Sequence, residues 1–251
     1  MITIAVIPAR LGSTRLPRKV LADLNGRPLL WYVWNQVCQS QQISVVYVAT
    51  DSEEVRGVVE SWGGQVLMTS PKCRSGTERV AECLGYLNAD LILNIQGDEP
   101  LIDPAMLDAL VDSWRLKPAD VITPICPIRS LEELCDPNVV KVARSTNGFA
   151  IYFSRSPIPF LRDVLLNQWL NTQTFWGHIG VYGYSPDALA AYATLPASTL
   201  ELAERLEQLR FLEAKYSILT METKYRSVAV DTSKDLERVQ AILSEHTAYK
   251  S

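Results

Sequence analysis

Residues 2–19 read ITIAVIPARLGSTRLPRK, an apolar run followed by a basic loop. The run at 2–7 has the continuous apolar character of a strand whose two faces are both buried in a parallel sheet. The loop at 8–19 combines cations with glycine, serine, threonine and proline, which are turn residues. Ligands of open α/β sheets bind beyond the carboxyl ends of the strands, so this loop lies where a ligand is expected.

The cations of this loop are Arg10, Arg15 and Lys19, and the small residues GST occupy positions 12–14. Free backbone N–H groups beside small side chains allow an anion to approach closely, and three cations suit a polyphosphate. A solvated basic turn is the alternative, because scattered Arg and Lys side chains usually lie at the surface. The rest of the chain has to distinguish between these two interpretations.

Composition narrows the class of protein. The chain has 251 residues, of which 47% are hydrophobic, so it is long and apolar enough to bury a substantial core. A net charge of −4 argues against a general nucleic-acid binder, which normally carries a basic face. No apolar stretch approaches the roughly 20 residues that span a bilayer, and the N-terminus lacks a signal-peptide pattern. We therefore expect a cytoplasmic protein with no nucleic-acid or membrane partner.

Cysteine and histidine usage argues against a structural metal centre. The chain contains five cysteines, widely spaced and without a CxxC pair, so neither a disulfide framework nor a zinc cluster is indicated. With two histidines, a histidine-rich metal site is excluded as well.

The order of expected elements indicates an α/β protein. The first half alternates helices with strands expected at 2–7, 45–49, 65–68 and 91–95, which predicts a parallel sheet with right-handed crossovers. The second half changes pattern. It predicts a helix at 105–116, strands at 120–125, 139–143, 150–154, 179–184 and 218–221, helices from Asp187 and over 200–214, and a final helix capped by Thr232 or Ser233. We expect one α/β domain, in which an antiparallel insertion at about 126–220 separates residues 1–125 from a return to the core at 221–251.

Two carboxylates follow expected strands. Asp98 comes after the strand at 91–95 within QGDEP, and Asp231 follows the apolar residues 228–230. Mg²⁺ is typically bound by one or two carboxylates together with substrate phosphates, so these two are candidate ligands. Each also has a structural alternative, because Asp-Glu-Pro forms a good turn and Asp-Thr-Ser is a helix-capping sequence.

The segment Ser75-Gly76-Thr77 is a further candidate for binding a nucleotide. Hydroxyls and N–H groups at a helix N-terminus can bind an anion or a polar base edge, although an N-cap explains Ser75 equally well.

Three common motifs are absent from the sequence. The chain has no GxGxxG dinucleotide fingerprint after the first strand, no GxxxxGK[ST] P-loop and no GxSxG motif of serine hydrolases. A basic loop with distant carboxylates fits in-line attack on the phosphorus of a nucleotide, where the protein mainly positions reactants and neutralises charge.

Polar residues of the second half are candidates for a second substrate. His178 and Tyr182 lie four apart in GHIGVYGY, which on a strand places both on one face, although Tyr182 suits a core equally well. Glu207 and Gln208 lie on an expected helix, where such residues are normally solvated. Arg155 follows YFS and is either a surface residue or a clamp for a carboxylate.

Together, nine segments resemble the 3-deoxy-manno-octulosonate (Kdo) cytidylyltransferase family, in the same order along the chain. They are IPARLGSTRLPRK, VATD, SGTERVAE, NIQGDEP, NVVKV, YFSRSPIP, HIGVYGY, LEQLR and VDTSKDLERV. The resemblance implies a nucleotide-diphospho-sugar transferase-like α/β fold, with a mostly parallel sheet flanked by helices and an antiparallel dimerisation and sugar-binding insertion. It also implies a homodimer that transfers CMP from CTP to Kdo, releases pyrophosphate, depends on Mg²⁺ and supplies Kdo for bacterial lipopolysaccharide.

The resemblance assigns roles to individual residues. The catalytic group would be Arg10, Arg15, Lys19 and Asp98. The nucleotide would be bound within residues 1–125, by Ala9, Arg10, Ser13, Arg15, Lys19, Arg74, Ser75, Gly76, Thr77 and Gln96. The sugar would be bound by Arg155, His178, Tyr182, Glu207 and Gln208, and Mg²⁺ by Asp98 and Asp231.

Three positions depart from the family pattern. Arg18 stands where the family usually has glycine, Val20 where it often has proline, and Cys73 where histidine is frequent. A non-glycine residue at a position with positive φ would be strained, so Arg18 raises the question of the loop's path. Two alternatives therefore stay open: transfer of CMP to another acid sugar, such as 8-amino-Kdo or sialic acid, and a nucleotide-binding module without catalysis.

Overall fold

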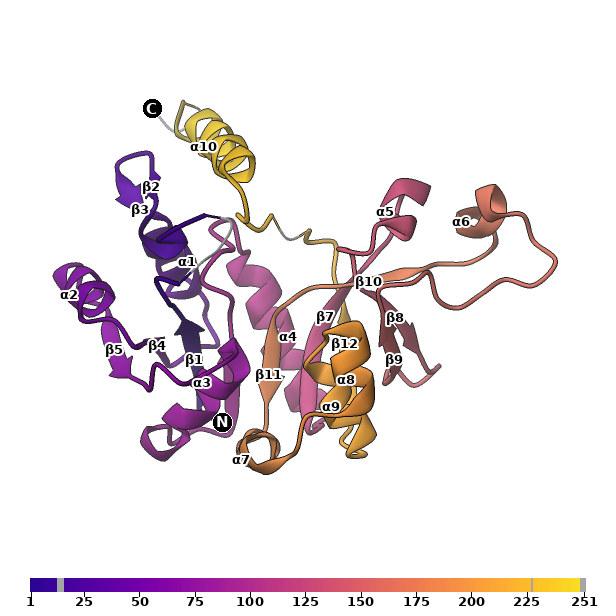
Figure 1. Ribbon diagram of the computed structural model, residues 1–251, viewed down its shortest axis with the longest axis horizontal. Helices are drawn as coiled ribbons and strands as arrows, with labels where there is room; N and C mark the ends of the chain where they lie inside the picture. The colour runs from indigo at the N-terminus through magenta and orange to yellow at the C-terminus, as the bar shows by residue number, and fades with distance from the viewer. Residues whose placement is uncertain (13–15, 227, 249–251) are drawn as a thin grey trace. The chain divides into compact units, whose positions relative to one another are not determined.

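The computed structural model describes residues 1–12, 16–226 and 228–248, and the chain packs as two compact units (Figure 1). The first unit is Met1–Val111 with the C-terminal segment from residue 228, and the second is Asp112–Arg226. These units divide the chain after residues 111 and 226, and the insertion expected at about 126–220 lies within the second unit. Strand β7 (Val121–Pro127) explains this division, because it pairs with strands of the second unit rather than with those of the first.

The first unit is built on a four-stranded parallel sheet, as the alternating pattern predicts. Its strands run in the order β5 (Gln65–Met68), β4 (Val45–Thr50), β1 (Thr3–Pro8) and β6 (Leu91–Asn94). Helices α1 (Leu29–Val37), α2 (Glu53–Ser61) and α3 (Gly76–Glu82) pack against this sheet, and α4 (Pro104–Leu116) follows β6 in the chain (Figure 1). All strands therefore end at the same edge.

Two helix starts and one turn of the first unit follow directly from the local sequence. The side chain of Ser52 accepts a hydrogen bond from Val55 N, and that of Ser75 accepts one from Glu78 N, so each is an N-cap. The Asn25-Gly26 pair has positive φ at both residues and joins the short strands β2 (Asp23–Leu24) and β3 (Arg27–Pro28). Helix α3 is short, because it passes into a 3₁₀ helix, η2 (Cys83–Tyr86).

The second unit is organised around β7. Strands β10 (Trp176–His178) and β11 (Tyr182–Tyr184) pair antiparallel with β7, and β12 (Ile218–Glu222) pairs parallel with it. The sheet continues from β10 to the expected hairpin of β8 (Lys141–Arg144) and β9 (Ala150–Ser154). The fold class is thus confirmed: a parallel sheet flanked by helices, with antiparallel strands added by the second half of the chain.

Two expected elements of the second unit differ from the expectation. The strand expected at 179–184 is shorter, because only β11 (182–184) forms within it; residues 179–181 lie in the interruption between β10 and β11, opposite Pro124 of β7, which has no N–H to donate to a partner strand. The helix expected over 200–214 divides into α8 (Thr199–Glu204) and α9 (Gln208–Glu213), because Arg205 adopts a left-handed conformation with φ of 54°. Both interruptions fall beside candidate site residues.

The remaining helices complete the two units. The second unit contains α5 (Leu131–Cys135), α6 (Trp169–Thr172) after a 3₁₀ turn η3 (Leu166–Gln168), and α7 (Pro186–Thr194), while the first unit contains the 3₁₀ helix η1 (Lys19–Leu21) and α10 (Ser233–Ala248). Helices α5 and α6 were not expected from the sequence; they enclose a small core of Ile128, Leu134, Trp169 and Phe175. Over the described part of the chain, no helix has the length and apolar character needed to cross a membrane.

Candidate active site

Three loops of the first unit converge where its parallel strands end. Ala9, directly after β1, is buried and donates a backbone hydrogen bond to Ala49 O at 2.8 Å. A Cβ on Gly76, the first residue of α3, would lie 3.2 Å from Pro8 Cγ and 3.8 Å from the amide of Gln96. A Cβ on Gly97 would lie 2.9 Å from Pro8 O, which is closer than Cβ atoms come in real proteins. Gly76 and Gly97 therefore allow the three loops to pack this tightly.

The basic loop after β1 is described on either side of a gap. Arg10 and Gly12 are exposed, whereas the predicted Ser13 and Arg15 lie outside the described residues. Arg18 has φ of 57°, so the residue that replaces the family's glycine does adopt the left-handed conformation. Its guanidinium forms an exposed ion pair with Glu54. Val20, the second departure, is buried in η1 and contributes an apolar side chain to the core.

Lys19 joins the two carboxylates that were predicted as metal ligands. Its Nζ lies 2.5 Å from Asp98 Oδ2 and 3.0 Å from Asp231 Oδ1. The chain is held there by a backbone bond of 2.9 Å from Val230 N to Asp98 O. Burial alone lowers the pKa of a lysine, but the charges and hydrogen bonds of Asp98 and then Asp231 outweigh it, so the pKa of Lys19 is raised.

Of the two structural alternatives for these carboxylates, the turn at Asp98 is present, with Glu99 N donating to Gln96 O at 3.4 Å, whereas Asp231 does not cap the last helix. Thr232, rather than Asp231, accepts the hydrogen bond from Asp235 N at the start of α10, and the Asp231 carboxylate contacts Lys19. Asp98 lies beyond the end of β6 with its carboxylate on the same ammonium group. Both acidic residues therefore bind a cation in this structure, which is the property that a metal ligand requires.

The residues predicted near the base surround the start of α3. Thr77 is buried, with its Oγ1 3.5 Å from Asn94 Nδ2, and Gln96 Nε2 is 3.5 Å from Asn94 Oδ1. Arg74 is exposed and pairs with Glu78 at 2.6 Å. The loop between β6 and Asp98 is thus connected to the helix start through side-chain amides.

Arg79 is a buried cation that was not predicted as a site residue. It is 3% exposed, lies 3.5 Å from Asp51 Oδ2 and donates a hydrogen bond to Thr69 Oγ1. It thereby ties α3 to the segments that follow β4 and β5. Both residues belong to segments that resemble the family, Asp51 to VATD and Arg79 to SGTERVAE. Their contact could not be predicted, because the two residues are far apart in the chain.

Cys73, the third departure, forms a local contact. Its Sγ lies 2.8 Å from Glu82 Oε2, and burial together with this carboxylate raises the pKa of Cys73 to about 11. The thiol is therefore protonated at neutral pH and donates to Glu82.

The predicted sugar residues of the second unit form an aromatic and polar cluster. Although β10 and β11 are separate strands, the rings of His178 and Tyr182 lie 5.2 Å apart, and Phe153 meets His178 edge to face at 5.3 Å. Burial lowers the pKa of His178 to about 3, so its imidazole is neutral. Burial also raises the pKa of Tyr182, with smaller contributions from Tyr184 and Glu207.

Glu207 and Gln208 lie where α9 begins, not in the middle of a long solvated helix. Tyr192 donates to Glu207 Oε2 at 3.2 Å. Gln208 is 4% exposed, and its Nε2 has no hydrogen-bond partner among the described residues. An unsatisfied buried amide costs roughly 1–3 kcal/mol, so it calls for a ligand or water.

A buried ion pair fixes this helix start. Arg210 donates to both oxygens of Glu201 on α8, at 2.7 and 2.6 Å, and its guanidinium lies 4.3 Å from the ring centroid of Tyr192. This ion pair is buried and bidentate, so it links α8 firmly to α9.

Arg155 has backbone partners. Its guanidinium donates to Glu204 O at 2.8 Å, Pro137 O at 2.8 Å and Arg205 O at 3.4 Å. These bonds occupy all three of its nitrogens, so this conformation supports the loops around the cluster rather than a carboxylate.

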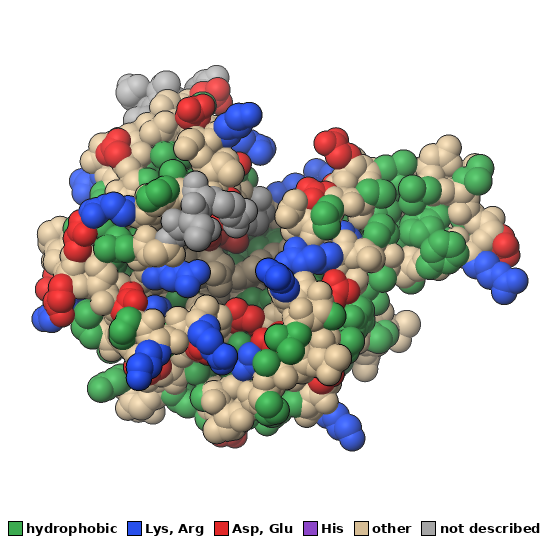
Figure 2. Space-filling view, viewed as in Figure 1, with side chains coloured by type: hydrophobic (Ala, Val, Ile, Leu, Met, Phe, Trp, Pro, Cys, Tyr) green, Lys and Arg blue, Asp and Glu red, His purple; other side chains and the backbone are tan. Residues whose placement is uncertain are grey.

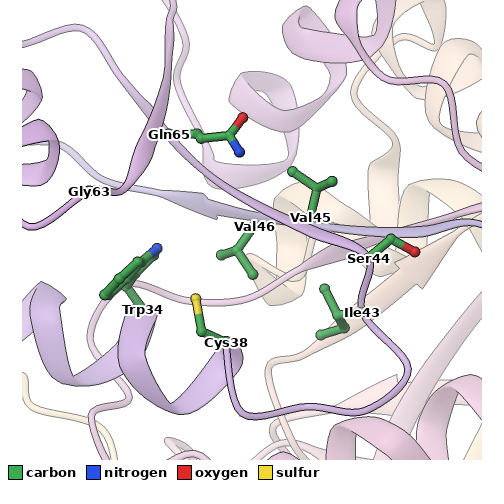
Figure 3. Close-up of a pocket in the computed structure, with 8 residues that line it drawn as sticks. All are labelled: Trp34, Cys38, Ile43, Ser44, Val45, Val46, Gly63 and Gln65. Atoms are coloured by element: carbon green, nitrogen blue, oxygen red, sulfur yellow. The ribbon is translucent and has the colours of Figure 1, made fainter.

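A pocket of about 220 Å³ in the first unit contains none of the predicted residues. It is lined by Trp34 of α1, Cys38 directly after α1 and Val46 of β4, together with residues 43–45, Gly63 and Gln65 (Figure 3). The pocket lies at the start of β4, whereas the converging loops follow the strand ends.

Within the described part of the chain, no three His, Cys, Asp or Glu side chains form a metal-binding group. A metal ion held by Asp98 and Asp231 would therefore need further ligands from a substrate.

Comparisons with known proteins place the chain in a family. A family model described as Cytidylyltransferase matches residues 4–221. The 3-deoxy-manno-octulosonate cytidylyltransferase of Chlorobium limicola is 47% identical over 246 residues, covering 97% of this chain and 98% of that protein. The enzyme of the same name from Trichlorobacter lovleyi is 42% identical, covering 94% and 96%.

A solved structure is similar over the same length. It is described as CMP:2-keto-3-deoxy-manno-octonic acid synthetase complexed with CTP, and it is 38% identical with a TM-score of 0.92, covering 98% of this chain and all of that one.

Proposed function

The chain belongs to the cytidylyltransferase family, and from that premise we propose that it is a nucleotidyltransferase that transfers CMP from CTP to Kdo. Its relatives at 47% and 42% identity carry the name of this activity over nearly their full length. The observation that carries the proposal is Lys19, held between Asp98 and Asp231 beside the loops at the strand ends. This set of charges suits a triphosphate with its metal ion.

The reaction is a substitution at the α-phosphorus of CTP. The anomeric hydroxyl of Kdo forms a new bond to this phosphorus, the bond to the bridging oxygen of the β-phosphate breaks, pyrophosphate leaves, and the hydroxyl proton is released. Such chemistry depends on positioning and on neutralising charge at the phosphates. Arg10 and Lys19 supply that charge, together with Arg15, while Ser13, Arg74, Gln96 and the start of α3 hold the nucleotide. The low pKa of His178 makes it a hydrogen-bonding group rather than an efficient base for this proton.

Asp98 and Asp231 are the proposed ligands of Mg²⁺. The residues fit the ion, because two carboxylates already share one cation and the triphosphate supplies further oxygens. When bound with CTP, Mg²⁺ neutralises developing charge on the phosphates. With the ion held by these carboxylates, Lys19 would be free to bind the triphosphate.

The sugar is proposed to bind at the cluster of the second unit. The buried Gln208 amide lacks a partner among the described residues, and a sugar hydroxyl or carboxylate would satisfy it. Glu207 accepts from hydroxyls, and the rings of His178 and Tyr182 pack against the sugar. Arg155 supports this site through the backbone carbonyls that it binds.

The test measures pyrophosphate release with CTP, Mg²⁺ and Kdo, with omission of each as a control. Turnover with Kdo and a lower kcat/KM for sialic acid and 8-amino-Kdo, offered as competitors, supports the proposal. A preference for another acid sugar would replace Kdo as the acceptor. Mg²⁺-dependent binding of CTP by calorimetry without turnover on any acid sugar would favour a nucleotide-binding module.

The proposal extends to assembly and location. We propose a homodimer, supported by the exposed apolar side chains of the second unit, which gather around α6 (Figure 2). Phe160, Leu165 and Leu166 are 76%, 69% and 46% exposed there, and exposed apolar patches mark interaction sites. We propose a cytoplasmic location, because CTP is an intracellular nucleotide, and a role in supplying Kdo for lipopolysaccharide.

A further inference from the structure

Thr123 of β7 is a fully buried hydroxyl beside His178. Its Oγ1 lies 3.0 Å from His178 Nε2, 2.8 Å from Val181 O and 3.2 Å from Ile179 O. The two carbonyls belong to the interruption between β10 and β11, opposite Thr123 and Pro124 of the unbroken strand. The interruption in the sheet therefore brings three polar atoms to one hydroxyl.

The hydrogen bonds of this group allow one protonation pattern. A threonine hydroxyl has one hydrogen and can accept from other donors, whereas a carbonyl oxygen can only accept. The hydrogen of Thr123 therefore points to a carbonyl, and Val181 O is the nearer one. Nε2 of His178 must then carry a hydrogen and donate it to Oγ1, because two lone pairs at 3.0 Å would repel.

A neutral imidazole with hydrogen on Nε2 has an acceptor at Nδ1. Burial lowers the pKa of His178, which keeps the ring neutral. Nδ1 makes no hydrogen bond to any described residue, so its lone pair is available to a ligand. Phe153 and Tyr182 pack against the same ring and restrict its rotation.

We propose that Thr123 is a positioning residue that fixes His178 in the Nε2–H tautomer and so presents Nδ1 as the acceptor for a hydroxyl of the acceptor sugar. This inference rests on the proposed function for the identity of the ligand, but the tautomer is a property of the free protein. Thr123 thereby contributes to recognition of a polyhydroxylated substrate without contacting it.

The first measurement is an imidazole ¹H–¹⁵N correlation spectrum of ¹⁵N-histidine protein without substrates. The chain has two histidines, so His246→Gln assigns the signals. We expect a protonated Nε2 and an unprotonated Nδ1 for His178 at pH 7. Thr123→Val removes the hydroxyl and should give a mixture of tautomers, whereas Thr123→Ser should keep the original pattern. A protonated Nδ1 in the unmodified protein, or an unchanged tautomer in Thr123→Val, overturns the proposal.

The second measurement is steady-state kinetics with the same variants. Loss of one ordered acceptor should raise the KM for Kdo about three- to tenfold in Thr123→Val. The KM for CTP should not change, and Thr123→Ser should have the original KM for Kdo. An unchanged KM for Kdo, or equal rises for both substrates, overturns the sugar-positioning role. Should the unmodified protein release no pyrophosphate with Kdo while the tautomer responds to Thr123→Val, the proposed function fails and the tautomer assignment stands.

Discussion

Lys19 illustrates how a residue's role depends on partners that are distant in the chain. Its two carboxylates lie 79 and 212 positions away, and only the parallel sheet and the return of the C-terminal segment bring them together. With both oxygens within hydrogen-bond distance, the ammonium group lies between the two carboxylates that we propose as Mg²⁺ ligands.

Replacing Lys19 by Met should create a metal site that does not depend on CTP. Removing a unit positive charge at contact distance favours a divalent cation by more than about 1.4 kcal/mol at an effective dielectric constant near 20, which corresponds to at least tenfold tighter binding. Electron paramagnetic resonance of free Mn²⁺ measures this directly. Lys19→Met combined with Asp98→Asn is the control and should lose the gain; equal Mn²⁺ affinity in the unmodified protein and Lys19→Met would contradict the assignment.

Arg18 is a left-handed residue at a site where glycine is free of strain. We expect Arg18→Gly to stabilise the protein by up to about 1 kcal/mol, because a strained left-handed residue costs more than the added freedom of glycine in the unfolded chain. The exposed ion pair with Glu54 contributes little. Urea unfolding measures the change, and Glu54→Gln, which removes only the ion pair, is the matched control. A lower stability for Arg18→Gly than for Glu54→Gln would contradict the strain.

His178 should make stability depend on pH in the acid range. Its pKa is about 3 in the folded protein and 6.5 in its unperturbed state, so below pH 6.5 the unfolded chain binds a proton that the folded protein does not. Stability from this residue is therefore lost as pH falls from 6.5 toward 3 and is unaffected above 6.5. Urea midpoints at pH 7.5 and 5 should fall less for His178→Gln than for the unmodified protein. Equal falls would show that the ring is not held neutral.

At the scale of elements, single residues decide where strands and helices break. Pro124 lies opposite the interruption that separates β10 from β11, and Arg205 separates α8 from α9. Polar side chains contact one another beside each break: His178 with Thr123 at the first, and Tyr192 with Glu207 at the second. His178 and Tyr182 flank the first break, and Glu207 and Gln208 follow the second.

Gly97 controls the path of the loop that carries Asp98. A Cβ there would lie 2.9 Å from Pro8 O, a backbone atom that cannot rotate away. Gly97→Ala should therefore destabilise the protein by about 1–3 kcal/mol and shift Asp98 away from Lys19, lowering kcat well beyond the effect on folding. Unfolding and kinetics together separate the two effects.

Gly57 of α2 provides the matched control for Gly97. A Cβ on Gly57 meets nothing within 4 Å, so Gly57→Ala should stabilise α2 by roughly 0.5–1 kcal/mol and leave turnover unchanged. If Gly97→Ala were as stable and as active as Gly57→Ala, the close approach of the Asp98 loop to Pro8 would be refuted.

At the scale of the molecule, the second unit carries both the cluster that we propose to bind the sugar and the apolar surface around α6. The connection between β9 and β10 runs out from its sheet and carries this surface (Figure 1). Phe160 packs edge to face on Trp169, which stacks on Phe175, so the exposed side chains stand on a well-packed base. An apolar surface of this kind suits the second copy of the chain in the proposed homodimer.

Phe160→Asp should convert the proposed dimer into a monomer. A charge at the centre of an apolar interface has no partner and remains hydrated only when the subunits separate. Light scattering coupled to size exclusion measures the mass. Leu116→Asp changes an 87% exposed leucine on α4 of the same unit and should remain dimeric. A monomer in the unmodified protein, or dimers in both variants, would exclude this surface as the interface.

The sequence by itself determined the local and repetitive features of this protein. Apolar runs and alternating helices predicted the parallel sheet, Ser75 was recognisable as a possible cap, and the nine segments indicated the family. These features depend on neighbouring residues, whose spacing the chain itself fixes. The residues proposed for the site were found in the same way, by their position after strands or within segments.

Only the tertiary structure decided which groups meet. The sharing of Lys19 by Asp98 and Asp231, the backbone partners of Arg155, the unsatisfied amide of Gln208 and the contact of Arg79 with Asp51 could not be derived from spacing. The division of the chain after residue 111 had the same origin, since β7 joins the strands that follow it. Hydrogen bonds and ion pairs act over about 3–4 Å, and the path of the chain through the sheet decides which distant residues come that close.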